Sequence, residues 1–155
     1  MDATTMQLTL SLVDRLTRDF REFQFTQGQT TMWEPSSRTI YYRSHQDDAE
    51  LLHELGHALL GHTDYKHDIA LLGYERDAWQ EAERLAPAYQ VKIDPQLIQD
   101  HLDTYRDWLH ARSTCPTCQA NGVQIKAHTY QCVACHSKWT VNEARTHALR
   151  RQKIK

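Results

Sequence analysis

The chain has 155 residues, of which 40% are hydrophobic and 25% are charged, which excludes a disordered chain and suits one folded domain with a small appendage. No apolar run approaches the roughly 18–20 residues of a membrane span. The segment Met1–Met6 lacks the basic start and apolar core of a secretory signal, so we expect a cytoplasmic protein without a membrane partner. The net charge of -2 conceals an asymmetry, because residues 1–112 carry 11 Lys and Arg against 19 Asp and Glu, whereas residues 113–155 carry 7 against 1.

The first 43 residues predict a helix followed by a small sheet. Residues 4–20 place apolar side chains at helical spacing with charged side chains opposite, which indicates an amphipathic helix. Residues 22–43 change to a period of two, with breaks at Gly28 and Pro35, and close on a β-branched and aromatic run. We therefore expect a three-stranded antiparallel sheet in this segment.

The next predicted helix carries the sequence His53-Glu-Leu-Gly-His57. Asp47 or Ser44 can cap its start, and several leucines give it an apolar face. His53 and His57 would lie one turn apart on one face, so their imidazoles can hold one zinc ion. Glu54 lies beside that face, where it can reach a metal-bound water and act as its general base. The alternative is an amphipathic helix whose polar side happens to carry two histidines.

A third metal ligand should follow this helix. Gly61 and His62 are expected to end the HExxH helix, and His62, five residues past His57, would lie about 140° round the helix from it, off the metal face. Glu75 lies in the middle of the apolar stripe of a helix expected over about residues 67–90. A buried carboxylate needs a partner, which a zinc ion would supply; an arginine or a backbone group is the alternative. Asp68 could accept a hydrogen bond from a ligand histidine, or simply begin the helix as a favourable charge.

The last helix of the main body begins at Asp94-Pro95, a cap followed by a first-turn proline. Its apolar face closes the core. His101 and His110 lie on or beside that face, and we interpret them as packing or surface histidines.

All four cysteines fall in two C-x-x-C pairs, Cys115–Cys118 and Cys132–Cys135, separated by 13 residues. This pattern is typical of a zinc ribbon, in which four thiolates bind one structural zinc. Residues 123–130 would form a short hairpin, and the metal would hold together a module too small to build its own core. Two disulfides are the alternative. The basic C-terminal segment could contact nucleic acid or an acidic partner, or could be a solvated tail.

The motif His53-Glu-Leu-Gly-His57, followed 18 residues later by Glu75-Arg-Asp-Ala-Trp79, resembles the ImmA/IrrE family of zinc metallopeptidases. The resemblance covers roughly residues 20–92, and the family pattern usually has Asn where Trp79 stands. It implies that His53, His57 and Glu75 bind the catalytic zinc, that Glu54 is the general base, and that the substrate is a protein such as a DNA-associated repressor. The added ribbon is similar instead to SprT-like proteases, which use a third histidine.

The expected architecture is therefore α+β. A zincin-like metallopeptidase domain would span residues 1–112, a four-cysteine zinc ribbon residues 113–142, and a basic tail residues 143–155. The zincin-like core would consist of the N-terminal helix, the three-stranded antiparallel sheet, the HExxH helix and two further helices.

Our hypothesis is a zinc metalloendopeptidase with two zinc ions per chain, one catalytic and one structural. Tyr42, Tyr74 and His67 are candidates for stabilising the oxyanion, and the sequence does not choose among them. Two alternatives stay open. One is a zinc-ribbon regulator that binds DNA or protein and uses the zincin core only as a scaffold, and the other is a SprT-like protease acting on DNA-bound proteins.

Overall fold

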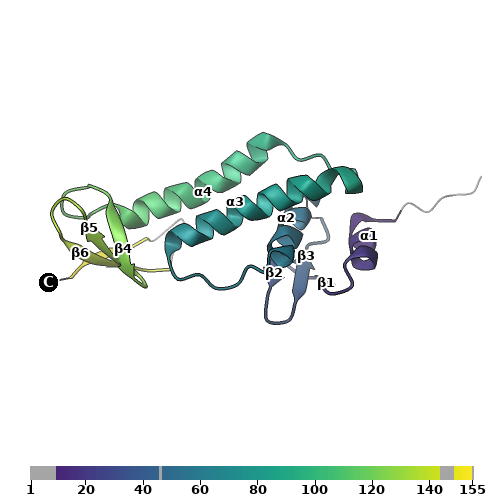
Figure 1. The fold of residues 1–155 in the computed structure, drawn as a ribbon, viewed down its shortest axis with the longest axis horizontal. Helices are drawn as coiled ribbons and strands as arrows, with labels where there is room; N and C mark the ends of the chain where they lie inside the picture. Colours follow the sequence, from purple (N-terminus) through teal and green to yellow (C-terminus); the bar gives the residue numbers. More distant parts are fainter. Residues whose placement is uncertain (1–9, 46, 144–148, 155) are drawn as a thin grey trace, which may run out of the picture. The chain divides into compact units, whose positions relative to one another are not determined.

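The structure is a computed structural model that describes residues 10–45, 47–143 and 149–154. These residues form four α-helices and two β-sheets, so the α+β class expected from the sequence is confirmed (Figure 1). None of the helices within the described ranges is both long enough and apolar enough to cross a membrane.

The chain divides into two compact units. One unit comprises residues 1–62 and 80–92, and the other comprises residues 63–79 and 93–155. The elements that lie wholly in the first unit are α1 (Leu12–Asp19), β1 (Gln24–Gln27), β2 (Met32–Glu34), β3 (Thr39–Tyr42), α2 (Asp48–Leu59) and a short 3₁₀ helix (Ala86–Tyr89). α3 (Asp68–Leu85) begins in the second unit and ends in the first. The second unit also contains α4 (Pro95–Ser113), β4 (Gly122–Lys126), β5 (Thr129–Cys132), β6 (Lys138–Val141) and β7 (Arg151–Lys153).

In the first unit, hydrogen bonds join α1 to the C-terminal end of the 3₁₀ helix. The hydroxyl of Tyr89 donates a hydrogen bond to the carboxylate of Asp19 at 2.8 Å. Burial and this bond raise the pKa of Tyr89 to about 12. Arg15, one turn earlier on α1, donates to the carbonyl oxygen of Tyr89 at 3.2 Å. Two segments far apart in the sequence are therefore held together at one place.

The sheet of the first unit is mixed, so the predicted antiparallel sheet is wrong. β3 lies in the middle, where it pairs in parallel with β1 and antiparallel with β2. Thr39 and Ile40 of β3 are buried, whereas β1 and β2 carry exposed residues. The most β-branched and aromatic strand therefore takes the central place, where both of its edges are paired. The alternating pattern identified the strands but did not fix their order.

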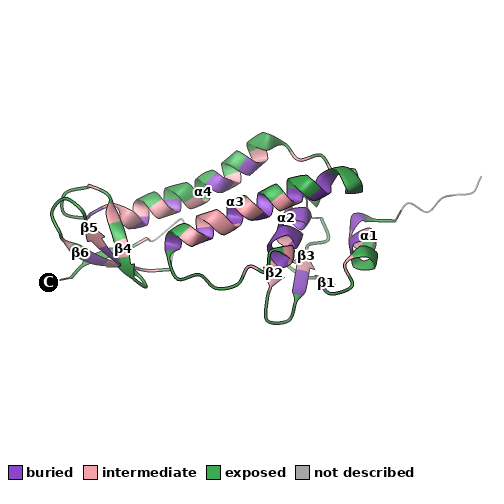
Figure 2. Ribbon diagram, viewed as in Figure 1, coloured by how far each residue is buried: buried purple, intermediate pink, exposed green. Residues whose placement is uncertain are grey.

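α2 is buried along most of its length (Figure 2). Its start is capped by Asp47, one of the two predicted caps, whose carboxylate accepts a hydrogen bond from the N–H of Ala49 at 2.7 Å. Its buried residues are Ala49, Leu51, Leu52, His53, Leu55, Gly56, His57 and Ala58. The two histidines are thus part of the packed face, where their imidazoles are shielded from bulk water.

In the second unit, α3 and α4 run antiparallel and side by side (Figure 1), and a buried ion pair joins them. Nε of Arg112 lies 2.8 Å from the carboxylate of Asp68, and the Arg112 side chain is only 2% exposed. The guanidinium also stacks on the ring of Trp108, 4.7 Å from its centroid. Removing one member of such a pair leaves a buried charge without compensation, which costs about 3–5 kcal/mol.

The four strands β4 to β7 form one antiparallel sheet in sequence order. β4 and β5 make the hairpin expected between the two cysteine pairs, and β7 comes from the basic C-terminal segment. The rings of Tyr130 and Trp139 stack with centroids 5.8 Å apart. Tyr130 donates its hydroxyl hydrogen to Asp68 at 2.6 Å, and the indole N–H of Trp139 donates to the carbonyl oxygen of Arg112 at 2.9 Å. The small sheet is therefore anchored on α3 and α4.

An added methyl group should have opposite effects on the free energy of unfolding at Gly122 and at Gly73. A Cβ at Gly122 would collide with Cη2 of the buried Trp139 and lie 2.8 Å from the carbonyl oxygen of Gln131. Gly122→Ala should therefore lower the free energy of unfolding by about 1–3 kcal/mol. Gly73 lies within α3 with open space around it, so Gly73→Ala should raise that free energy by roughly 0.5–1 kcal/mol. Urea unfolding of the full chain measures both, and a Gly122→Ala variant as stable as the wild type would contradict the packing described.

Candidate metal centres

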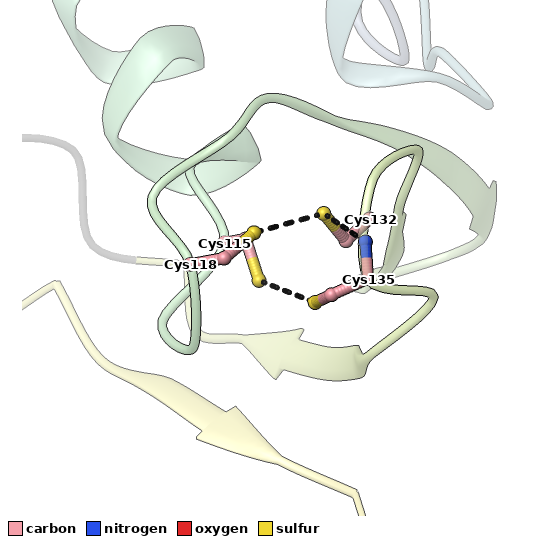
Figure 3. Close-up of side chains that lie close together, drawn as sticks. All are labelled: Cys115, Cys118, Cys132 and Cys135. Carbon is pink, nitrogen blue, oxygen red and sulfur yellow. Dashed lines mark hydrogen bonds between the residues drawn. The ribbon is translucent and has the colours of Figure 1, made fainter.

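The four cysteines converge on one point in the second unit (Figure 3). The Sγ atoms of Cys115 and Cys135 are 3.7 Å apart, and those of Cys118 and Cys132 are 3.5 Å apart. All four are free thiols, and a disulfide would need an S–S separation of about 2.0 Å, so the disulfide alternative does not describe this structure. All four sulfurs lie within 4.8 Å of one another. The cluster could hold a metal ion.

Backbone N–H groups point at two of the four sulfurs of the cluster. The N–H of Thr117 points at Sγ of Cys115 at 3.4 Å, and the N–H of Ala134 points at Sγ of Cys132 at 3.3 Å. The hydroxyl and the backbone N–H of Ser137 lower the pKa of Cys135 to about 6. Because metals bind the thiolate rather than the thiol, the donors at Ser137 favour a cation at Cys135. At Cys118 the backbone of Ala120 lowers the pKa, but the neighbouring thiols outweigh it and raise that pKa to about 11.

His53, Glu54 and His57 form a second group on α2 in the first unit. The ring centroids of the two histidines are 4.6 Å apart, and the three residues offer ligand atoms that lie within 4.8 Å of one another. His53 is 4% exposed and His57 is 8% exposed. Oε1 of Glu54 lies 3.5 Å from Nδ1 of His53. The one-turn spacing read from the sequence thus brings together a second set of residues that could hold a metal ion.

Trp33, on β2, fixes Glu54, and the sequence offered no signal for this role. Its backbone N–H donates to Oε2 of Glu54 at 2.8 Å. Its indole N–H donates to the carbonyl oxygen of His62 at 3.0 Å, and its ring meets Phe23 edge-on with centroids 5.5 Å apart. Trp33 therefore holds both the carboxylate on α2 and the residue that follows the helix.

His62 lies against His57, contrary to the position expected from helical spacing. α2 ends at Leu59, and Gly61 has a φ of 67°, so the chain turns back rather than continuing the helix. The Nδ1 atoms of His57 and His62 are 2.9 Å apart. The expected angle of about 140° assumed that the helix continued. Gly61 was the feature of the sequence that indicated the end of the helix.

Glu75 is buried on α3 in the second unit, at 6% exposure, as its place in the apolar stripe predicts. Its Oε2 lies 3.9 Å from Nδ1 of His101, a residue interpreted from the sequence as packing or surface. The indole N–H of Trp79 donates to the same Nδ1 at 2.8 Å. Asp68, the possible acceptor for a ligand histidine, accepts hydrogen bonds from Arg112 and Tyr130.

The three oxyanion candidates lie in different parts of the fold. Tyr42 ends β3 in the first unit and is half-buried. In the second unit, Tyr74 is half-buried on α3, and His67 is exposed just before that helix. Their positions do not single out one of them.

Comparison with known protein families, curated proteins and solved structures gave no match for the chain.

We expect two metal ions per chain, one in each group of ligands. A substitution in one group should remove its ion and leave the other bound. Cys132→Ser should remove the ion of the cysteine cluster, and His53→Ala should remove the ion held on α2, because each substitution deletes a ligand. Ser137→Ala is the matched control, since it removes the hydroxyl that hydrogen-bonds with Sγ of Cys135 at 3.2 Å but removes no ligand, and it should keep both ions. Mass-spectrometric metal analysis of the purified proteins measures this, and equal metal content in Cys132→Ser and wild type would contradict the assignment.

Proposed function

We propose that this protein is a zinc metalloendopeptidase that hydrolyses peptide bonds of a protein substrate. The observation that carries the proposal is the grouping of His53, Glu54 and His57 on the buried α2, with Glu54 held by the N–H of Trp33. We assign zinc because imidazole and carboxylate donors are typical of catalytic zinc sites, and four thiolates are typical of structural ones. The chain would bind two zinc ions, one of each kind.

Glu75 is the residue that we propose as the third ligand of the catalytic zinc. Two observations support it: its place 18 residues after His57 in the sequence, and its position on the buried face of α3. The same spacing makes the chain similar to ImmA/IrrE-like gluzincins. We extend that similarity to the substrate class, a DNA-associated regulator or repressor.

The proposed chemistry assigns proton transfer to Glu54. The zinc ion, when bound, would polarise the scissile carbonyl and acidify the attacking water. Glu54 accepts a proton from that water and later donates it to the nitrogen of the departing amine. Because Trp33 holds Oε2, the proton-accepting atom is Oε1, the oxygen nearer His53. The carboxylate is 19% exposed, which leaves it within reach of water. Tyr42, Tyr74 and His67 stay candidates for stabilising the oxyanion.

A second candidate function is favoured by the basic C-terminal segment. Arg151 and Lys153 are exposed on β7, an edge strand of the described sheet, and Lys138 is exposed on the neighbouring β6. Such a surface suits nucleic acid or an acidic protein. The chain would then be a ribbon-based regulator with the zincin core as a scaffold, or a SprT-like protease acting on DNA-bound proteins.

Glu54→Gln separates the enzyme from the regulator. The amide keeps the shape of the side chain but accepts no proton, so we expect cleavage to fall about 10²–10⁴-fold, with the zinc content unchanged. The measurement compares new protein N-termini in cells that express wild type or Glu54→Gln. Glu50→Gln is the matched control, since Glu50 is on the same helix, and its half-buried carboxylate pairs with Arg43 at 3.1 Å.

The enzyme proposal expects termini that are present with wild type and Glu50→Gln and absent with Glu54→Gln. Cleavage that persists in Glu54→Gln would refute the mechanism. No difference among the three, with the zinc still bound, would favour the regulator.

A further inference from the structure

His62 is held in a fixed position against His57. The two Nδ1 atoms are 2.9 Å apart, and the ring centroids are 5.1 Å apart with the planes at 64°. The backbone of His62 is fixed on both sides, because its N–H donates to the carbonyl oxygen of His57 at 3.0 Å and its own carbonyl accepts the indole N–H of Trp33 at 3.0 Å. Its ring is also half-buried. The contact is therefore built into the turn after α2.

A hydrogen bond between two Nδ1 atoms requires that one of them carries the proton. If His57 donates, its neutral ring carries the second lone pair on Nε2, the form that can bind a cation there. If His62 donates, the proton of neutral His57 lies on Nε2, and that nitrogen is closed to a metal. Ligand histidines typically donate their second N–H to a nearby acceptor, which fixes the tautomer and the ring orientation.

We propose that His62 is a positioning residue, which accepts a hydrogen bond from Nδ1–H of His57 and thereby presents Nε2 of His57 to the metal. This role rests on the proposed function, since it takes His57 as a zinc ligand. His62 does not itself bind the ion. An acceptor is normally a carboxylate or a carbonyl, and here an imidazole supplied by the turn at Gly61 takes its place.

The test uses variants of the full chain that separate ring packing from hydrogen bonding. His62→Phe keeps an aromatic ring against His57 but has no acceptor, whereas His62→Gln keeps an acceptor oxygen. His45→Gln is the control, at an exposed histidine of the same unit. Zinc affinity is measured by competition with a chromophoric chelator, and the α2 ion is identified as the one lost in His53→Ala.

We expect His62→Phe to weaken zinc binding on α2 by about 10–100-fold, and His62→Gln and His45→Gln to bind close to the wild-type affinity. In the zinc-loaded wild type, long-range ¹H–¹⁵N NMR should find His57 with its proton on Nδ1. Wild-type affinity in His62→Phe would overturn the proposal, as would equal losses in His62→Phe and His62→Gln, or a proton on Nε2 of His57. A wild type that binds no ion on α2 would contradict the proposed function itself, and this role with it.

Discussion

The hydrogen bond from the backbone of Trp33 to Glu54 couples the small sheet to α2, and the arrangement of the candidate metal group on α2 depends on it. A carboxylate that is only 19% exposed needs strong donors, and an N–H on a paired strand supplies one at 2.8 Å. The same tryptophan fixes His62 through its indole, and His62 in turn contacts His57. One residue of β2 therefore positions the proposed general base directly and one proposed ligand indirectly. Such support is what holds catalytic groups in a productive geometry.

The second unit depends on a different constraint, the buried charge of Arg112. Asp68 neutralises it, Trp108 covers its face, and the carbonyl oxygen of Asn142 accepts from its Nη1. Tyr130 completes the group by donating to Asp68, and burial together with that bond raises the pKa of Tyr130. Because strands and helices share this network, the cysteine cluster that follows α4 is held by packing as well as by any ion it binds.

The sequence predicted those parts of the structure that local spacing determines. The one-turn separation of His53 and His57 and the two C-x-x-C pairs placed both candidate metal groups, since ligand geometry follows from the helix and from the tight turn. The remaining features of the structure depend on packing between residues that are far apart in the sequence. The most β-branched and aromatic strand, β3, lies in the centre of the sheet. An alternating pattern identifies strands but does not specify their order. Trp33 reaches Glu54 across 21 residues of sequence, and His62 reaches His57 only because Gly61 reverses the chain.

The central claim is that α2 holds a zinc ion through nitrogen and oxygen ligands, separate from the ion of the cysteine cluster. X-ray absorption spectroscopy at the zinc edge, on the metal-loaded wild type, tests it most directly, because the two kinds of ligand differ in bond length. The account predicts two populations of nearest neighbours, sulfur at about 2.3 Å and nitrogen or oxygen at about 2.0–2.1 Å, with the scattering pattern of imidazole. A spectrum described by sulfur alone would contradict it.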